Sequence, residues 1–289
     1  MPFWFWAMVV FVYGAVIGSF LNVCIYRMPK DESIIKPPSH CPKCNTKLTV
    51  LDLVPLVSFL ALGRKCRYCG APIGWRYFTV ELATALVFVA LYARYRFEAD
   101  FFAFALFSAA LIAVFFIDLD HWIIPDQLSV FGIGLGIARD VFGLATREAG
   151  HSLLRIPIPF TRVEVPMLWS VAGLVVCGAI FYGIAIFGEL AFKKEAMGGG
   201  DIKLAAAVGA IFAGSLAQTL GLELALLSFF IAVFVGSLIG VGMKIARRGR
   251  AKDSYLPFGP MMVIGVLITM LFGSQLIAAY VRFLYRGGL

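Results

Sequence analysis

Charged side chains are scarce in this chain. They make up 15% of its 289 residues, whereas hydrophobic residues make up 61%. This balance excludes an ordinary soluble domain and predicts a polytopic membrane protein. The basic residues give a net charge of +8 but form no face interleaved with aromatic residues, so no nucleic-acid partner is expected. In a membrane protein they indicate instead which loops are cytoplasmic.

Two other features are missing from the sequence. No basic residue precedes the first apolar run, which meets a positive charge only at Arg27, the reverse of the charge order in a cleaved signal peptide. We therefore expect a retained helix with its N-terminus outside. The chain also shows no short internal repeat. Internal repeats are common in transporters.

Eight apolar stretches are present, each close to the length of about 20 residues that crosses a bilayer. They cover residues 3–26, 77–96, 101–117, 124–144, 167–190, 202–221, 223–243 and 259–281. The predicted fold is an all-α polytopic membrane protein of about eight transmembrane helices, with a small cytoplasmic loop between the first two. We divide the chain into the first transmembrane helix (1–26), the cytoplasmic four-cysteine loop (27–76) and a transmembrane core (77–289).

Loop charges predict the orientation of these helices. If the N-terminus lies outside, the cytoplasmic segments are 27–76, 118–123, 191–203 and 244–258. In that order they hold nine, none, three and five Lys and Arg residues, which is 17 of the 25 in the chain. This excess of Lys and Arg predicts that these segments are cytoplasmic. Because eight helices cross the membrane, the C-terminus is expected outside as well. The outer segment 139–166 carries four arginines against this trend, and because it is proline-marked it is expected to form a small hairpin.

Two CxxC pairs lie in the loop between the first two apolar segments. They are Cys41 with Cys44 and, after 21 intervening residues, Cys66 with Cys69. Two such pairs on a polar loop are the ligand spacing of a tetrahedral zinc site, which has a structural role because four cysteines leave no open position for water. Two disulfides are the alternative, but the cytoplasm is reducing. Between the pairs, the apolar run 53–60 is too short to span; we expect it to lie in the membrane interface or to pack on the helices.

Two aspartates terminate apolar segments. Asp118 follows the run that ends at Ile117, and Asp201 follows three glycines, Gly198–Gly200, which permit positive φ and close approach of other groups. Two predicted spans separate the aspartates, so both fall on one side of the membrane. If they meet in a partly desolvated pocket, they share a proton and can hydrolyse an amide as general base and general acid. Unrelated helix caps or a transporter's ion-coupling site are the alternatives.

Other acidic residues receive simpler interpretations. Asp120 is expected to be solvated, and Asp126 is expected to cap the next helix. Glu81 is interpreted as a charge partner of Arg76 or Tyr77 near the start of its helix.

An ordered series of motifs then extends over nearly the whole chain. It consists of Gly18-Ser19-Phe20-Leu21-Asn22, Tyr26-Arg27-Met28-Pro29, the two CxxC pairs, Ile117-Asp118-Leu119-Asp120-His121, Pro125-Asp126, Gly198-Gly199-Gly200-Asp201-Ile202-Lys203 and Pro257-Phe258-Gly259-Pro260. With this series the chain resembles the type IV prepilin peptidases, membrane aspartyl proteases of the GxGD group.

The resemblance implies an activity and a site. The family cleaves the cationic leader of prepilins and pseudopilins after a glycine on the cytoplasmic side of the bacterial inner membrane, and it methylates the new N-terminus from S-adenosylmethionine. The catalytic pair falls on Asp118 and Asp201, with Gly198, Gly200 and Lys203 in the surrounding motif. The family's zinc loop falls on the four cysteines named above. The expected partners are prepilins and the lipid bilayer, and the system served, pilus or secretion, is left open.

Two other functions remain as alternatives. A transporter would use buried acids for ion coupling, and a zinc-loop signalling or scaffold protein would dispense with both aspartates. The sequence has no glycine-rich strand–helix nucleotide fold, so it names no residues for the methyl donor.

Overall fold

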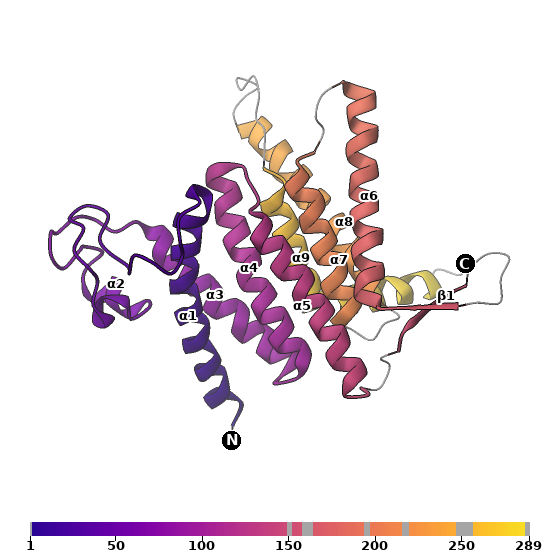
Figure 1. The fold of residues 1–289 in the computed structure, drawn as a ribbon, viewed down its shortest axis with the longest axis horizontal. Helices are drawn as coiled ribbons and strands as arrows, with labels where there is room; N and C mark the ends of the chain where they lie inside the picture. Colours follow the sequence, from indigo (N-terminus) through magenta and orange to yellow (C-terminus); the bar gives the residue numbers. More distant parts are fainter. Residues whose placement is uncertain are drawn as a thin grey trace. The chain divides into compact units, whose positions relative to one another are not determined.

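The computed structural model describes residues 2–148, 152–157, 164–193, 197–215, 220–246 and 257–286. The chain divides into two compact units, Met1–Ile123 and Ile124–Leu289. Both are helical, as the composition predicts, and Figure 1 labels their helices and strands.

The first unit contains three long helices and a loop with short helical turns. The elements are α1 (Phe3–Arg27), η1 (Met28–Lys30), η2 (Val50–Leu53), α2 (Val57–Ala61), α3 (Trp75–Tyr95) and α4 (Ala99–His121). Helices α1, α3 and α4 pack on one another (Figure 1). Small residues allow this contact, because a Cβ added to Gly14 or Gly18 would lie 2.7 Å from the backbone of α3.

The loop of the first unit is tied to both helices that flank it. The guanidinium of Arg27, at the end of α1, is buried and donates to the carbonyl oxygens of Ser33 and Pro37 at 2.9 and 2.7 Å. The Asn22 amide donates to the carbonyl of Tyr77 in α3 at 3.1 Å. These side chains from the first two sequence motifs therefore hold the loop entry and the α1–α3 contact.

The second unit contains five long helices and a hairpin. Its elements are α5 (Asp126–Ala145), β1 (Leu154–Pro157), β2 (Glu164–Met167), α6 (Trp169–Phe192), α7 (Gly199–Ser215), α8 (Gly221–Ala246) and α9 (Gly259–Arg286). Helix α7 packs on α5, α6 and α8, and every residue from Leu204 to Ser215 is buried. The antiparallel pairing of β1 with β2 confirms the expected hairpin for its described residues.

The predicted membrane segments correspond one by one to long helices. Within the described residues, seven helices are long and apolar enough to cross a membrane. Helix α7 has 17 described residues and is the most enclosed of the long helices, and residues 216–219 that follow it lie outside the described ranges. The predicted all-α polytopic membrane fold is therefore confirmed.

Candidate metal site and candidate active site

The two CxxC pairs form two turns of the same kind. In the first, the N–H of Cys41 donates to Thr46 O and the N–H of Asn45 donates to Cys41 O, at 3.0 and 2.9 Å. In the second, Cys66 and Gly70 make the equivalent bonds at 2.8 and 2.9 Å. The residue after each pair, Asn45 or Gly70, has positive φ (56° and 69°), which asparagine and glycine tolerate well.

These turns bring the four sulfurs together. The Sγ atoms of Cys41, Cys44, Cys66 and Cys69 all lie within 4.8 Å of one another, and Cys41 and Cys69 are 3.9 Å apart. A tetrahedral ion with bonds of about 2.3 Å to sulfur separates its ligands by roughly 3.8 Å. All six cysteines of the chain are described and all are free thiols, so the structure does not adopt the disulfide alternative. The donor set fits a metal ion that prefers thiolate.

The thiols differ in how readily they ionise. Hydrogen bonds from Thr46 lower the pKa of Cys44 to about 6, and backbone N–H groups of Cys69 and Tyr68 lower the pKa of Cys66. The N–H of Ala71 lowers the pKa of Cys69, but burial and the neighbouring thiols raise it to about 11. Without a cation the four thiols therefore resist ionising together, which is what a bound metal would relieve.

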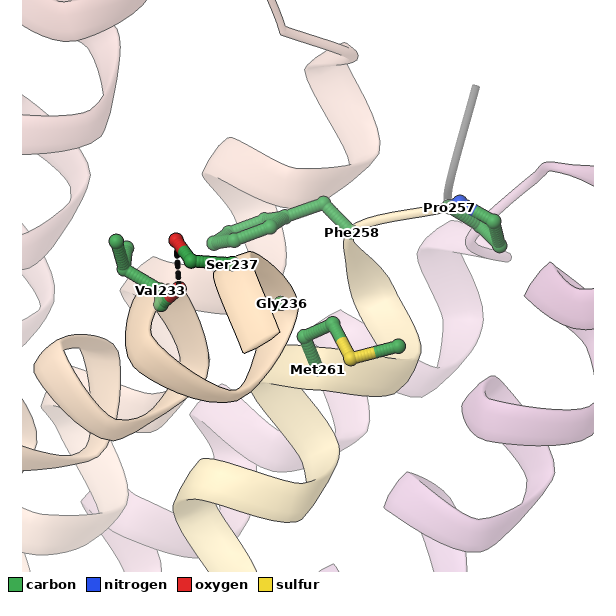
Figure 2. Close-up of a pocket in the computed structure, with 6 residues that line it drawn as sticks. All are labelled: Val233, Gly236, Ser237, Pro257, Phe258 and Met261. Carbon is green, nitrogen blue, oxygen red and sulfur yellow. Dashed lines mark hydrogen bonds between the residues drawn. The ribbon is translucent and has the colours of Figure 1, made fainter. Parts of the chain in front are cut away.

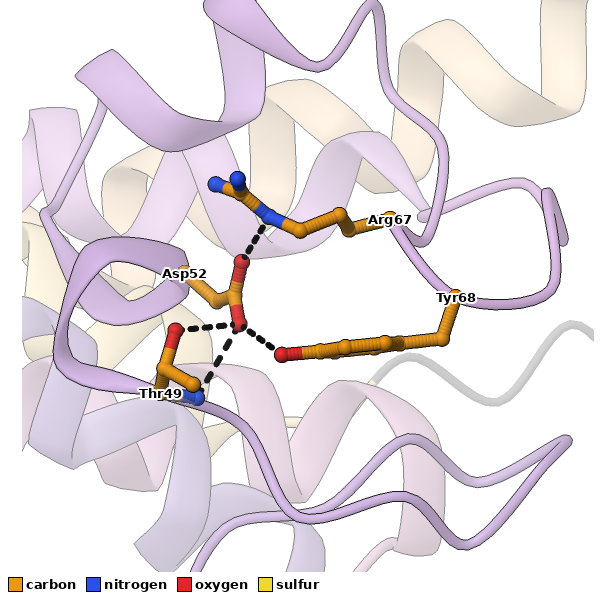
Figure 3. Close-up of polar contacts among 4 residues, drawn as sticks. All are labelled: Thr49, Asp52, Arg67 and Tyr68. Atoms are coloured by element: carbon orange, nitrogen blue, oxygen red, sulfur yellow. Dashed lines mark hydrogen bonds and ion pairs between the residues drawn. The ribbon is translucent and has the colours of Figure 1, made fainter.

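A buried carboxylate joins the second turn to the segment that precedes it (Figure 3). The Asp52 side chain is 4% exposed and accepts from Thr49 N and Oγ1 at 3.0 and 2.7 Å, from Arg67 Nε at 2.7 Å and from Tyr68 Oη at 3.0 Å. The hydrogen bonds from Thr49, followed by those from Arg67 and Tyr68, hold the pKa of Asp52 well below its usual range. The sequence interpretation missed this residue, although Thr49-x-x-Asp52 matches a capping box.

Asp118 lies in the last turn of α4, in the first unit. Its side chain is 6% exposed, and its carbonyl accepts the N–H of Trp122, which ends the helix in the left-handed conformation at φ 59°. Helix α4 packs against α1 and α3, and near this end Arg76 of α3 pairs with Asp120. A carboxylate in so enclosed a place is expensive and calls for a function.

Asp201 lies in the first turn of α7, in the second unit, and is half-buried. Its N–H donates to Gly198 O at 3.1 Å. A Cβ added to Gly200 would lie 2.9 Å from Ile124 Cβ, whereas one added to Gly199 would meet nothing. The described glycines with positive φ are Gly63 and Gly70, so of the two possibilities that glycine permits at Gly198–Gly200, the structure uses close approach, at Gly200. Because Asp118 and Asp201 belong to different compact units, their pairing stays a prediction.

Two ion pairs involve the other motif aspartates. Lys203 Nζ donates to Asp126 Oδ2 at 2.6 Å, which links the starts of α7 and α5. Asp126 is the first residue of α5, the N-terminal position where the sequence analysis expects an anion, and it accepts the Lys203 bond from there. Asp120 is exposed, as expected, and pairs with Arg76 of α3.

The interpretation of Glu81 was wrong. Its carboxylate does not pair with Arg76 or Tyr77 but is buried and accepts the N–H of Leu56 at 2.8 Å. Leu56 has φ 61°, a strained conformation for leucine, and directly precedes α2. Glu81 therefore holds the loop against α3.

A pocket of about 300 Å³ lies between α8 and the start of α9 (Figure 2). It is lined by Val233, Gly236, Ser237, Pro257, Phe258 and Met261. The Ser237 hydroxyl donates to Val233 O at 2.8 Å, which leaves a largely apolar wall. The pocket includes none of the predicted site residues.

Comparison with known proteins covers both halves of the chain. Residues 12–95 match the bacterial peptidase A24 N-terminal domain, and residues 105–241 match the type IV leader peptidase family. A prepilin leader peptidase/N-methyltransferase of Pseudomonas aeruginosa is 32% identical over 93% of this chain and 91% of its own length. Proteins of the same name from Bacillus subtilis and Aeromonas hydrophila are each 31% identical, over 95% and 96% of this chain and 97% and 94% of their own lengths. No solved structure matches the chain significantly.

The fold and the cysteine cluster define a polytopic membrane protein with a potential metal-binding loop. The matches go further: the chain belongs to the type IV leader peptidase family. The resemblance stated from the motifs is confirmed, and the chain is an integral protein of the inner membrane. Nothing in these findings supports the transporter alternative.

Proposed function

We propose that this chain is a membrane endopeptidase that removes the cationic leader of type IV prepilins or pseudopilins after a glycine and methylates the new N-terminus. The observation that carries the proposal is full-length similarity to three proteins named prepilin leader peptidase/N-methyltransferase, which span this chain almost from end to end. The type IV leader peptidase match includes both Asp118 and Asp201.

Hydrolysis is assigned to Asp118 and Asp201, acting as a pair that shares one proton. The ionised carboxylate removes a proton from water, whose oxygen bonds to the scissile carbonyl carbon, while the protonated carboxyl donates to the carbonyl oxygen. The C–N bond then breaks, and the leaving amine takes up a proton from the pair. Because two carboxyl groups held close together cannot both ionise, the pair supplies one acid and one base. Neither a metal nor a covalent intermediate is needed.

The placement of each aspartate supports this assignment. Each lies at the end of a long apolar helix, where a carboxylate can be partly desolvated and still reach a substrate at the membrane boundary. Two candidate membrane spans, α5 and α6, separate them in the sequence, so both ends fall on one side if each helix crosses. Gly198 and Gly200 shape the approach to Asp201, and Lys203 ties the start of α7 to Asp126.

The cysteine cluster is assigned to a structural zinc ion. Cys41, Cys44, Cys66 and Cys69 would hold it as a closed tetrahedral site, which leaves no position for a catalytic water. From Asp31 to Gly74 the buried residues are Cys41, Phe59 and Cys66, too few for an apolar core. Bound zinc would therefore supply much of the folding free energy of the loop.

The remaining assignments concern substrate, donor and topology. The methyl donor is S-adenosylmethionine, and the substrates are prepilins whose apolar helix enters the membrane at the cleavage point. The active site faces the cytoplasm and both termini lie outside, in accord with the 17 of 25 Lys and Arg in the proposed cytoplasmic segments.

Mass spectrometry of a co-expressed prepilin tests the function. The expected product has lost its leader and gained one methyl group on the new N-terminus. A prepilin whose glycine before the cut is replaced by a bulky residue is the control and should stay intact. If the mature form never appears although the chain is present in the membrane, the proposed function is wrong.

A further inference from the structure

The apolar segment 50–61, formed by η2 and α2, leaves large side chains exposed in an otherwise polar loop. Val57 and Leu60 are each 62% exposed, and Val50 and Leu51 are 81% and 69% exposed. Neighbouring apolar residues exposed in this way mark an interaction surface.

The segment is fixed at a known level of α3. Phe59 is buried, and its ring centroid lies 5.5 Å from that of Trp75 and 5.3 Å from that of Phe78. One turn further along α3, the Glu81 carboxylate accepts the Leu56 N–H at 2.8 Å. Since a helix rises 1.5 Å per residue, these contacts cover about 9 Å of α3 from its first residue.

That stretch is the first part of α3, where a helix that crosses a membrane meets the lipid–water boundary. Helix α3 is a candidate membrane span that begins at Trp75, and Trp75 is half exposed, as expected of an aromatic residue at the lipid–water boundary. Amphipathic helices that lie on a bilayer bury their apolar side chains to a depth of about 5–10 Å. The contacts of α2 with the first residues of α3 place α2 within this depth of the bilayer surface.

The surrounding charge fits an anionic lipid surface. Residues 27–76 contain nine Lys and Arg but three Asp and Glu. Lys47, Arg64 and Lys65 are exposed on either side of the apolar segment, and the Arg64 guanidinium lies 4.6 Å from the Trp75 ring centroid. Basic residues that flank apolar ones favour anionic phospholipid headgroups.

We propose that residues 50–61 are an interfacial membrane anchor, with Val57 and Leu60 among the acyl chains and the flanking basic residues on anionic headgroups. The anchor holds the cysteine loop against the bilayer through Phe59 and Glu81. The surface is assigned to lipid because Phe59 and Glu81 hold it beside the first residues of a candidate membrane span, and because basic residues flank it.

The test uses the full chain reconstituted in vesicles of phosphatidylcholine and phosphatidylglycerol. An environment-sensitive fluorescent amino acid replaces Leu60 or, in a second variant, Val57; both positions are exposed, so neither replacement disturbs packing. The same label at Asn45, on the exposed first turn, is the matched control. Phospholipids brominated on their acyl chains should quench the label at Leu60 and Val57 several-fold more than the label at Asn45.

Three results would overturn the proposal or part of it. If the labels at Leu60 and Val57 are quenched no more than the label at Asn45, the segment does not enter the bilayer. If they respond to added prepilin but not to brominated lipid, the surface binds protein instead. Replacing phosphatidylglycerol with phosphatidylcholine should weaken quenching, and unchanged quenching would overturn the role of the basic residues. Because no readout is cleavage, failure here is distinct from failure of the proposed function.

Discussion

The cysteine loop and helix α7 hold their motif residues by opposite means. The loop buries few side chains and depends on Asp52, on backbone hydrogen bonds and on the proposed metal ion. Helix α7 is tied at its start by the Lys203–Asp126 ion pair, and along its described length it is surrounded by close contacts of small residues, such as Gly209 against Gly173 and Ala210 against Gly136. The loop should therefore unfold when a metal ligand is removed, and the packing of α7 should be destabilised when one of its small side chains is enlarged.

Loss of one metal ligand should have the largest effect on the loop. Cys66→Ser is expected to abolish stoichiometric zinc binding and to unfold the loop, because structural zinc supplies folding free energy. Trypsin should then cut at Lys and Arg between residues 43 and 67, while the helical units stay resistant. Cys24→Ser, a change in α1 rather than in the loop, is the control and should retain zinc. A loop that resists protease fully without metal would contradict the claim that the loop depends on the metal ion for its fold.

Added volume in α7 should have the next largest effect. Gly209→Val would drive its Cβ into the Gly173 carbonyl of α6, and we expect about 3 kcal/mol or more of destabilisation. Thermal unfolding in detergent measures this loss. Gly183→Val, where a Cβ meets nothing within 4 Å, should change stability by less than about 0.5 kcal/mol. Equal losses for the two variants would show that close packing does not set the stability of α7.

A smaller effect is expected from Asp52→Asn, which weakens the clamp between Thr49 and the second turn. Trypsin cleavage of the loop should become several-fold faster at pH 7. The folded-state pKa of Asp52 is lowered, so its stabilising contribution is full above its ordinary pKa of about 4 and is lost as the pH falls through the folded value. The difference between wild type and variant should therefore persist from pH 7 to about pH 5. A difference that disappears within this range would refute the role of the carboxylate.

A further predicted change concerns the approach to Asp201. Gly200→Ala places a Cβ 2.9 Å from Ile124 Cβ, so the start of α7 must shift, and we expect leader cleavage to slow by about tenfold. Gly199→Ala meets open space and should cleave at nearly the wild-type rate. Initial cleavage rates at equal membrane levels measure both. If Gly199→Ala is the slower of the two, close approach at Gly200 is not the reason for the glycine.

Local patterns predicted much of this structure. Apolar runs predicted every long helix, because a membrane span needs a continuous apolar length, and CxxC spacing predicted the cysteine cluster, because each turn is local. The contacts of Asp52 with Arg67 and of Glu81 with Leu56 join residues 15 and 25 positions apart, and no periodicity reports such pairs. The contact of Gly200 with Ile124 is likewise a product of helix packing, so the glycines indicated that close approach was possible but not which residue would approach.

The shared-proton pair is tested most directly by single-turnover cleavage of a purified prepilin with Asp118→Asn and Asp201→Asn. Asparagine keeps the size of aspartate but cannot carry the proton, so each variant should lose about 10²–10⁴-fold in rate while keeping its zinc and its thermal stability. Asp120→Asn and Asp126→Asn, which alter exposed ion pairs, are the matched controls and should stay within a few-fold of wild type. Cleavage at nearly the wild-type rate by either Asp118→Asn or Asp201→Asn would contradict the assignment of the pair.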